Sequence, residues 1–118
     1  MRHKKHKYKL GVDPSHRKAM MKNLVTSLVE HGKIKTTHTR CLALRSCVEK
    51  LITKAKVDTV ARRRLVFSRV NNANVVKKLF TEIAPKFKDR NGGYVRVLKL
   101  PDGRVGDSAK MSYITFVD

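Results

Sequence analysis

Acidic residues are scarce in this sequence of 118 residues, which has nine Asp and Glu against 28 Lys and Arg. The formal net charge is therefore +19, and the cationic residues occur in every segment rather than in one tail. Such a chain repels itself unless a polyanion neutralises it. The nine acids are also too scattered to indicate a catalytic carboxylate cluster. Nucleic acid is the predicted partner.

Long apolar runs are missing as well, and the longest are far too short for a membrane-spanning helix. The N-terminus is basic, but no apolar segment follows it, so no secretory signal is predicted. No strong amphipathic anchor or lipidation signal supports binding to a membrane surface. The sequence therefore predicts a cytoplasmic protein with no membrane partner and no small-molecule substrate, and not an independent homo-oligomer.

Cysteine is limited to Cys41 and Cys47, with no CxxC element and no second pair. Neither a disulfide framework nor a zinc ribbon is indicated, and two reduced thiols in a helix are expected. His3 and His6 lie in a lysine-rich tail without an acidic or thiol partner, which makes a poor metal site. We predict no metal, no cofactor and no enzymatic activity.

Aromatic residues number only seven, so the core is expected to be modest and mainly aliphatic. A chain of this length is about the size of one ordinary domain. Residues 1–13 are basic and poor in apolar side chains, which predicts an extension that becomes ordered on RNA. Residues 14–118 are predicted to form a single RNA-binding domain.

Helical spacing of apolar residues predicts most of this domain. Asp13 and Pro14 favour a helix start, and the helix is expected to run to about residue 31, where Gly32 supplies a left-handed stop. Residues 33–37 suit a brief strand. Further helices are predicted from about residue 39 through 55, from 59 through 69 and from 75 to 83, the last one ending before Pro85.

Two β-rich runs, 94–100 and 111–117, are separated by turn residues and predict an antiparallel hairpin with a moderately long loop. The predicted fold class is α+β. The helices are expected to pack on one face of a small three-stranded mixed sheet, with a basic N-terminal tail.

Several basic segments are candidate contacts for a polyanion. Arg62, Arg63 and Arg64 span nearly a full helical turn, so at least two of them must face solvent or a partner. Arginine matches phosphate oxygens and stacks on exposed bases, which suits unpaired RNA. Residues 15–18 occupy a first helical turn, where unpaired N–H groups favour phosphate. The turn at residues 90–96 adds Arg90 and Arg96. Each segment also has a purely structural alternative: a solvated charge run for the tail, a capped helix start for residues 15–18, and a hairpin entry with Tyr94 packed under it for residues 90–96.

The predicted RNA-binding residues are mainly basic and come from the tail, the helices and the hairpin. They are Arg2, His3, Lys4, Lys5, His6, Lys7, Lys9, Ser15, His16, Arg17, Lys18, Lys22, Lys35, Thr36, Thr37, Arg40, Arg45, Arg62, Arg63, Arg64, Arg69, Arg90, Asn91 and Arg96.

Two rival functions are weaker. A DNA-binding helix-turn-helix protein would place residues 33–37 in a turn, whereas they resemble a strand, and its charge would follow one recognition helix. An RNA-processing enzyme would need a clustered acid–base or metal set, which the sequence does not contain.

Short motifs in a fixed order along the whole chain carry a resemblance to a known family. They are Met1-Arg2-His3, Ser15-His16-Arg17, residues 28–37, Leu44-Arg45, Glu49, Leu51-Ile52-Thr53, Arg63-Arg64-Leu65, Leu79-Phe80, Arg90 with Gly92-Gly93-Tyr94 and Arg96, and Gly106-Asp107. In this order and spacing the chain resembles the bacterial large-subunit ribosomal protein family numbered seventeen. It departs from that pattern at Thr39, Ala43 and Val95.

The resemblance implies an α+β domain on the large ribosomal subunit near the nascent-chain exit. It implies contacts with ribosomal RNA and neighbouring ribosomal proteins, no catalytic activity, and a bacterial cytoplasmic location. The family motifs carry phosphate and sugar contacts over to the tail, residues 15–18, residues 35–37, and to Arg45, Arg63, Arg64, Arg90 and Arg96.

Overall fold

The computed structural model describes residues 13–117. Its first helix, α1 (Pro14–His31), begins and ends where the sequence predicts. The Asp13 carboxylate accepts a hydrogen bond from the His16 backbone N–H at 2.8 Å, which caps the helix start. Gly32 adopts a left-handed conformation with φ +78°, and its N–H donates to the Leu28 carbonyl. This turn sends the chain directly into strand β1 (Lys33–Thr37).

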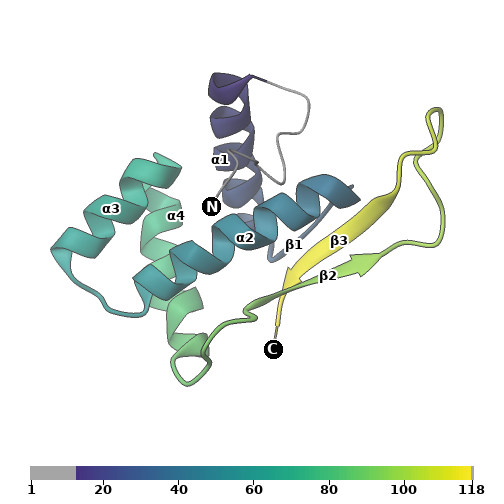
Figure 1. The fold of residues 1–118 in the computed structure, drawn as a ribbon. Helices are drawn as coiled ribbons and strands as arrows, with labels where there is room; N and C mark the ends of the chain where they lie inside the picture. The colour runs from purple at the N-terminus through teal and green to yellow at the C-terminus, as the bar shows by residue number, and fades with distance from the viewer. Residues whose placement is uncertain (1–12, 118) are drawn as a thin grey trace, which may run out of the picture.

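Helix α2 (His38–Ala55) follows β1 without a loop and crosses the sheet (Figure 1). It starts one residue before the predicted position, at His38. The His38 N–H donates to the Lys110 carbonyl at 2.9 Å, so the far end of the hairpin satisfies a backbone group that a helix start leaves open. The buried face of α2 consists of Cys41, Leu44, Val48, Leu51, Ile52 and Ala55. Both cysteines lie on α2 as free thiols, as predicted.

Helix α3 (Val60–Val70) is capped by Thr59, whose side chain accepts from the Arg62 N–H at 3.2 Å. It ends at Asn71 in a left-handed conformation, and Asn72 then caps α4 (Ala73–Lys78). The predicted stop before Pro85 is wrong. The chain continues as a π-helical turn, η1 (Leu79–Ile83), and a 3-10 turn, η2 (Ala84–Phe87), because proline is tolerated in the first turn of a new helical segment.

The sheet contains β1, β2 (Val95–Lys99) and β3 (Met111–Phe116) in the order β1-β3-β2. β2 and β3 form the predicted antiparallel hairpin, and β1 also pairs antiparallel with β3. The predicted mixed sheet is therefore wrong in this detail, although the α+β class is confirmed. β1 and β2 do run in the same direction, but β3 lies between them, so no parallel pair forms.

Strand alternation gives the sheet two unlike faces. On the inner face, Ile34 and Val97 flank Ile114, which is fully buried. α2 packs against this face, and α1 packs against β1. On the outer face, Lys35 and Leu98 flank Tyr113. The predicted arrangement of helices on one face is confirmed.

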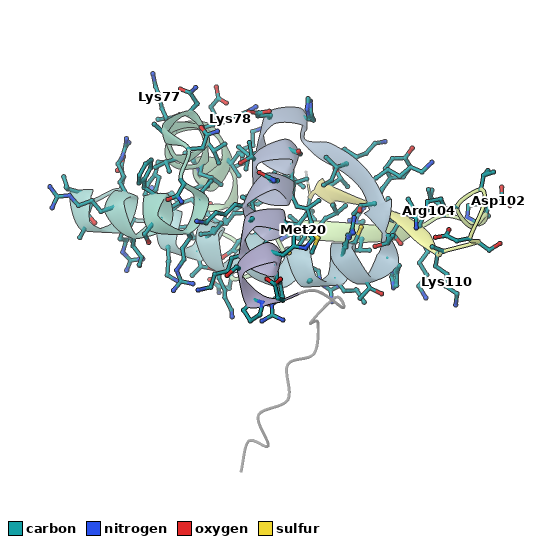
Figure 2. The ribbon with its side chains drawn as sticks, turned by 90° about the horizontal axis from the view of Figure 1, so that it is seen from above. Met20, Lys77, Lys78, Asp102, Arg104 and Lys110 are labelled. Atoms are coloured by element: carbon teal, nitrogen blue, oxygen red, sulfur yellow. The ribbon has the colours of Figure 1, made fainter. Side chains whose placement is uncertain are left out.

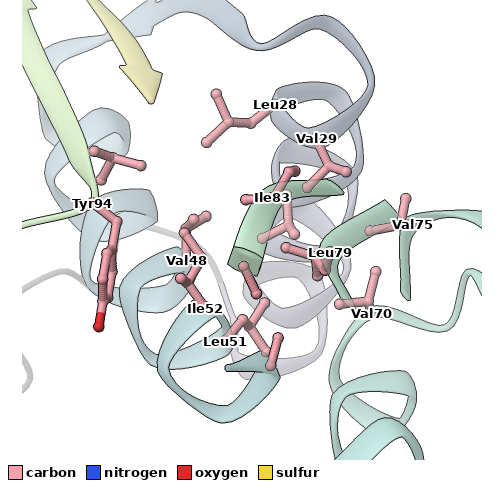
Figure 3. Close-up of a cluster of buried hydrophobic side chains, with 14 of the residues drawn as sticks. Leu28, Val29, Val48, Leu51, Ile52, Val70, Val75, Leu79, Ile83 and Tyr94 are labelled. Carbon is pink, nitrogen blue, oxygen red and sulfur yellow. The ribbon is translucent and has the colours of Figure 1, made fainter. Parts of the chain in front are cut away.

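The core lies between α1, α2, α4, η1 and the inner face of the sheet (Figure 3). Leu28, Val48 and Leu79 are fully or almost fully buried and come from three different helical segments. Tyr94 closes the core next to β2, with its ring centre 5.2 Å from that of Phe87. As expected from the composition, aliphatic side chains dominate this core.

Candidate nucleic-acid interface

A groove of about 820 Å³ lies between α1, α2 and α3. Met21, Val25 and Leu51 supply apolar side chains to its lining. Six of the thirteen lining residues are cationic and none is acidic. The cations are Arg17, Lys18, Lys22, Lys50, Lys54 and Arg69. We call these six residues and the space between them the basic groove.

Helix α2 contributes to the core with one side and to the basic groove with another, and Leu51 lies where the two sides meet. Leu44, Val48 and Ile52 repeat every four residues and are buried. Lys50 and Lys54 are also four residues apart, and at roughly 100° per residue they lie on the far side of the helix. One helix therefore separates the sheet from the groove.

The side chains at the edge and floor of the groove are held by neighbouring groups. With the Asn71 side-chain amide turned so that both of its groups are satisfied, its oxygen accepts from the Lys22 ammonium at 2.7 Å and its nitrogen donates to the Phe67 carbonyl at 3.1 Å. Burial raises the pKa of the Cys47 thiol, although nearby Lys50 and Arg69 act in the opposite direction. Cys47 is therefore a neutral thiol in the groove, not an activated nucleophile.

The start of α1 has less room for a phosphate than the sequence suggests. Ser15 and His16 are exposed, but the His16 N–H is already bonded to the Asp13 carboxylate. This carboxylate would also repel an anion placed on the helix axis. Arg17 and Lys18 follow in the same turn and extend into the basic groove instead.

Two of the three consecutive arginines are paired with other groups of the protein at its surface. Arg62 donates to the Lys54 carbonyl at 3.3 Å and ties α3 to the end of α2. Arg63 forms a bidentate pair with Asp58 at 2.6 and 2.8 Å, and its guanidinium lies 5.1 Å from the ring centre of Phe80. This pair raises the pKa of Arg63 and lowers that of Asp58. Arg64 is exposed.

The remaining predicted residues are spread over other parts of the surface. Thr36 belongs to the inner row of the sheet, whereas Lys35, Thr37 and Arg96 belong to the outer face. The exposed predicted residues of α2 and of the turn before β2 are Arg40, Arg45, Arg90 and Asn91. The tail residues Arg2, His3, Lys4, Lys5, His6, Lys7 and Lys9 lie outside the described residues.

The structure thus gathers four predicted residues, Arg17, Lys18, Lys22 and Arg69, into one groove. Lys50 and Lys54 complete this groove and were missed by the sequence analysis. A signal for them existed, because both lie opposite the apolar stripe of a predicted helix. What the sequence does not show is that α1 and α3 bring further cations to the same side.

Other kinds of site find little support in residues 13–117. No group of three or more His, Cys, Asp or Glu side chains in this range is placed to hold a metal ion. Within the same range, no helix combines the length and the apolar character that crossing a membrane requires.

Comparison with known protein families decides the assignment. Residues 20–117 match the model of the family described as Ribosomal protein L17, which covers most of the chain. The chain belongs to the ribosomal protein L17 family. Members of the L17 family are structural proteins of the large ribosomal subunit, and the chain is accordingly a ribosomal protein that takes part in translation as part of a ribonucleoprotein. The matched region contains every element from α2 onward and most of α1.

Proposed function

We propose that this L17-family protein binds and stabilises large-subunit ribosomal RNA as a structural, non-enzymatic component. The observation that carries this proposal is the basic groove, where six cations from three helices converge and no acidic residue belongs to the lining. Neighbouring cations repel one another, so this arrangement is favourable only when an anion occupies the groove. The phosphate backbone of RNA supplies such anions at regular spacing.

The groove is suited to holding a backbone in position rather than to reading bases. Lysine is a compact cation on a flexible stem, and four of the six cations at this surface are lysines: Lys18, Lys22, Lys50 and Lys54. Contacts of this kind fix the position of an RNA segment and carry no sequence information by themselves. Bound RNA would neutralise the groove cations of α1, α2 and α3 and so remove the repulsion between them.

The finer placement rests on the family resemblance. We propose that the protein lies near the nascent-chain exit of the bacterial large subunit, beside neighbouring ribosomal proteins and in the cytoplasm. We further propose that residues 14–118 act as one RNA-binding domain and that the tail adds phosphate contacts. Exposed Arg40, Arg45, Arg64 and Arg90 can reach RNA without rearranging the fold.

The test is the double variant Lys50→Ala/Lys54→Ala, with binding to deproteinised large-subunit ribosomal RNA measured between 50 and 200 mM salt. Each lost phosphate contact should lower affinity about fivefold near physiological salt, so the expected loss is roughly 25-fold. The slope of log affinity against log salt should fall by about two.

Lys86→Ala/Lys88→Ala is the matched control, because both lysines are exposed and lie outside the basic groove. It removes the same net charge and should change affinity much less. Equal losses in the two double variants would mean that total charge, not the groove, drives binding. Stronger competition by duplex DNA than by ribosomal RNA would favour the DNA-binding alternative.

Association with the ribosome is tested separately by sedimenting a lysate through a sucrose gradient in high salt. We expect the protein in stoichiometric amount with the large subunit. Cross-links from exposed lysines to a stalled nascent chain would test the proposed exit location, and their absence would move the protein elsewhere on the subunit.

A further inference from the structure

The outer face of the sheet is a second cationic surface, separate from the basic groove. Lys33 and Arg96 flank Thr115, and Lys35 and Leu98 flank Tyr113 in the next row. Lys33, Lys35, Arg96 and Leu98 are all exposed. The strand residues on this face include three cations and no acid. Together with Thr37 and Met111, these residues make up the outer face.

An aromatic ring lies in the middle of the outer face. The Lys33 ammonium is 4.5 Å from the ring centre of Tyr113, and Leu98 is 46% exposed beside it in register. Exposed leucine next to an aromatic ring and cations is costly to leave in water and favourable under a nucleobase. A base that stacked on Tyr113 would displace the Lys33 ammonium, which could then pair with the adjoining phosphate.

A hollow of about 570 Å³ continues the outer face toward the hairpin loop. Lys35, Met111 and Tyr113 line it from the strands, and Arg104 and Asp102 line it from the loop. Figure 2 shows Arg104 and Asp102 at the far end of the molecule, in the loop beyond the strands. The hollow gives a strand lying across the sheet a place for one further nucleotide.

The outer face and the basic groove are separate surfaces with no residue in common. The inner face of the sheet packs on the buried stripe of α2, and the groove lies on the other side of that helix. A single RNA segment that filled the groove would therefore have to pass around the protein to reach Tyr113.

Building on the proposed RNA binding, we infer that the outer face is a second RNA site that takes an unpaired strand. One base stacks on Tyr113, and Lys33, Lys35 and Arg96 hold the flanking phosphates. The protein then joins two RNA segments on opposite sides of α2 and the sheet. Charge favours RNA over an average protein neighbour as the occupant, because three cations surround the apolar centre.

Tethered cleavage probes can test whether two segments are bound. In a Cys41→Ala/Cys47→Ser background, single cysteines are introduced by Val105→Cys on the exposed loop beside the outer face and Ser46→Cys in the basic groove, and an iron–EDTA probe is attached to each. Each protein is bound to deproteinised large-subunit ribosomal RNA, and the cleaved nucleotides are mapped. We expect two separate sets, with unpaired nucleotides in the set cleaved from position 105.

The two probes separate failure of this inference from failure of the proposed function. Cleavage from position 46 alone, or the same nucleotides from both positions, would overturn the second site and leave the groove in place. Absence of specific cleavage from both positions would overturn both proposals.

Substitutions at Tyr113 test the stacking itself. Tyr113→Phe keeps the ring and should bind RNA normally, whereas Tyr113→Leu fills similar space without a π face. Loss of one stacked base should lower affinity about fivefold to a hundredfold. Lys35→Ala, at an exposed position, should cost about fivefold and serves as a variant that is not expected to disturb folding.

The same series separates an RNA occupant from a protein occupant. If Tyr113→Leu and Lys35→Ala both bind the RNA like the unaltered protein, the outer face is not an RNA site. Unaltered RNA affinity together with loss of these variants from assembled large subunits would point to a neighbouring protein on this face instead. The unfolding midpoint of each variant is measured first, so that only folded protein is compared.

Discussion

The basic groove and the outer face are both cationic, but they differ in shape and in chemistry. The groove is concave and combines six cations with an apolar lining from three helices. The outer face is a strand surface with three cations around one aromatic ring and an exposed leucine. On our proposals, phosphate contacts fill the first, whereas the second also receives a base. The comparison shows that an excess of Lys and Arg yields different binding chemistry according to the element that presents it.

The two sides of the sheet should respond very differently to truncation. Ile114→Ala removes the fully buried centre of the inner face and should lower the free energy of unfolding by about 2–5 kcal/mol. Leu98→Ala, on the exposed outer face, should lie within roughly 0.5 kcal/mol of the unaltered protein. Urea unfolding of the two variants checks this difference. A large cost for Leu98→Ala would mean that the outer face is part of the structural core and not available to a partner.

Gly32 joins α1 of the groove to β1 of the outer face, so a substitution at this residue tests the connection between the two regions. Gly32→Ala should lower the free energy of unfolding by about 1–2 kcal/mol, because φ is +78° and an L side chain disfavours that conformation. A Cβ at this position meets nothing within 4 Å, so crowding does not contribute. Thermal unfolding measures the loss.

Gly32→Asn is the informative companion, since asparagine tolerates left-handed backbone better than alanine. A smaller loss for Asn than for Ala is expected. Equal losses in the two variants would show that the left-handed conformation is not the cause.

The smallest expected effect concerns the loop that closes the hollow beside the outer face. Arg104 donates two hydrogen bonds to Asp107, and with the backbone N–H of Ala109 they lower the pKa of this carboxyl to about 2 from its usual 3.8. Because the pKa of Asp107 is lower in the folded state than in the unfolded state, its ionised carboxylate stabilises the loop above pH 3.8. This stabilisation is lost as the pH falls through about 2. Arg104→Ala should raise the pKa of Asp107 toward its usual value, as a carboxyl-detected NMR titration can show.

Stability near neutral pH should hardly change in Arg104→Ala, because both side chains are about half exposed. If the pKa of Asp107 remained near 2 without Arg104, the backbone hydrogen bond from Ala109 would be its main cause. If the shape of the loop contributes to RNA binding, Arg104→Ala should weaken RNA binding at the outer face and leave binding in the basic groove unchanged.

Local signals made much of the fold predictable. Asp13, Pro14 and Gly32 mark both ends of α1, and Thr59 and Asn71 mark those of α3, because caps act on the nearest backbone groups. Where prediction failed, distant groups were responsible. The start of α2 depends on a bond to Lys110, and the turn through Pro85 is packed into the core by Ala84 and Phe87.

The candidate site was predictable as a list of residues and not as a surface. Basic composition pointed to Arg17 and Lys22 on one helix and to Arg69 on another, but helical periodicity does not relate residues of different helices. The same composition included Arg62 and Arg63, which the fold uses for its own packing and pairing. Periodicity places a side chain on one face of its own element and carries no information about which element lies opposite.

Composition by itself predicted a polyanionic partner, since a net charge of +19 on 118 residues does not depend on the fold. The order of motifs along the chain pointed to the L17 family, which the family match from residue 20 to 117 then established. Only the tertiary structure decided where the charge is concentrated. Packing of α1 and α3 on α2 brings six cations into one groove, and pairing of β1 and β2 with β3 sets three more around Tyr113 on the opposite side. These arrangements depend on contacts between residues far apart in the chain, because burial of the shared apolar core fixes which surfaces remain outside.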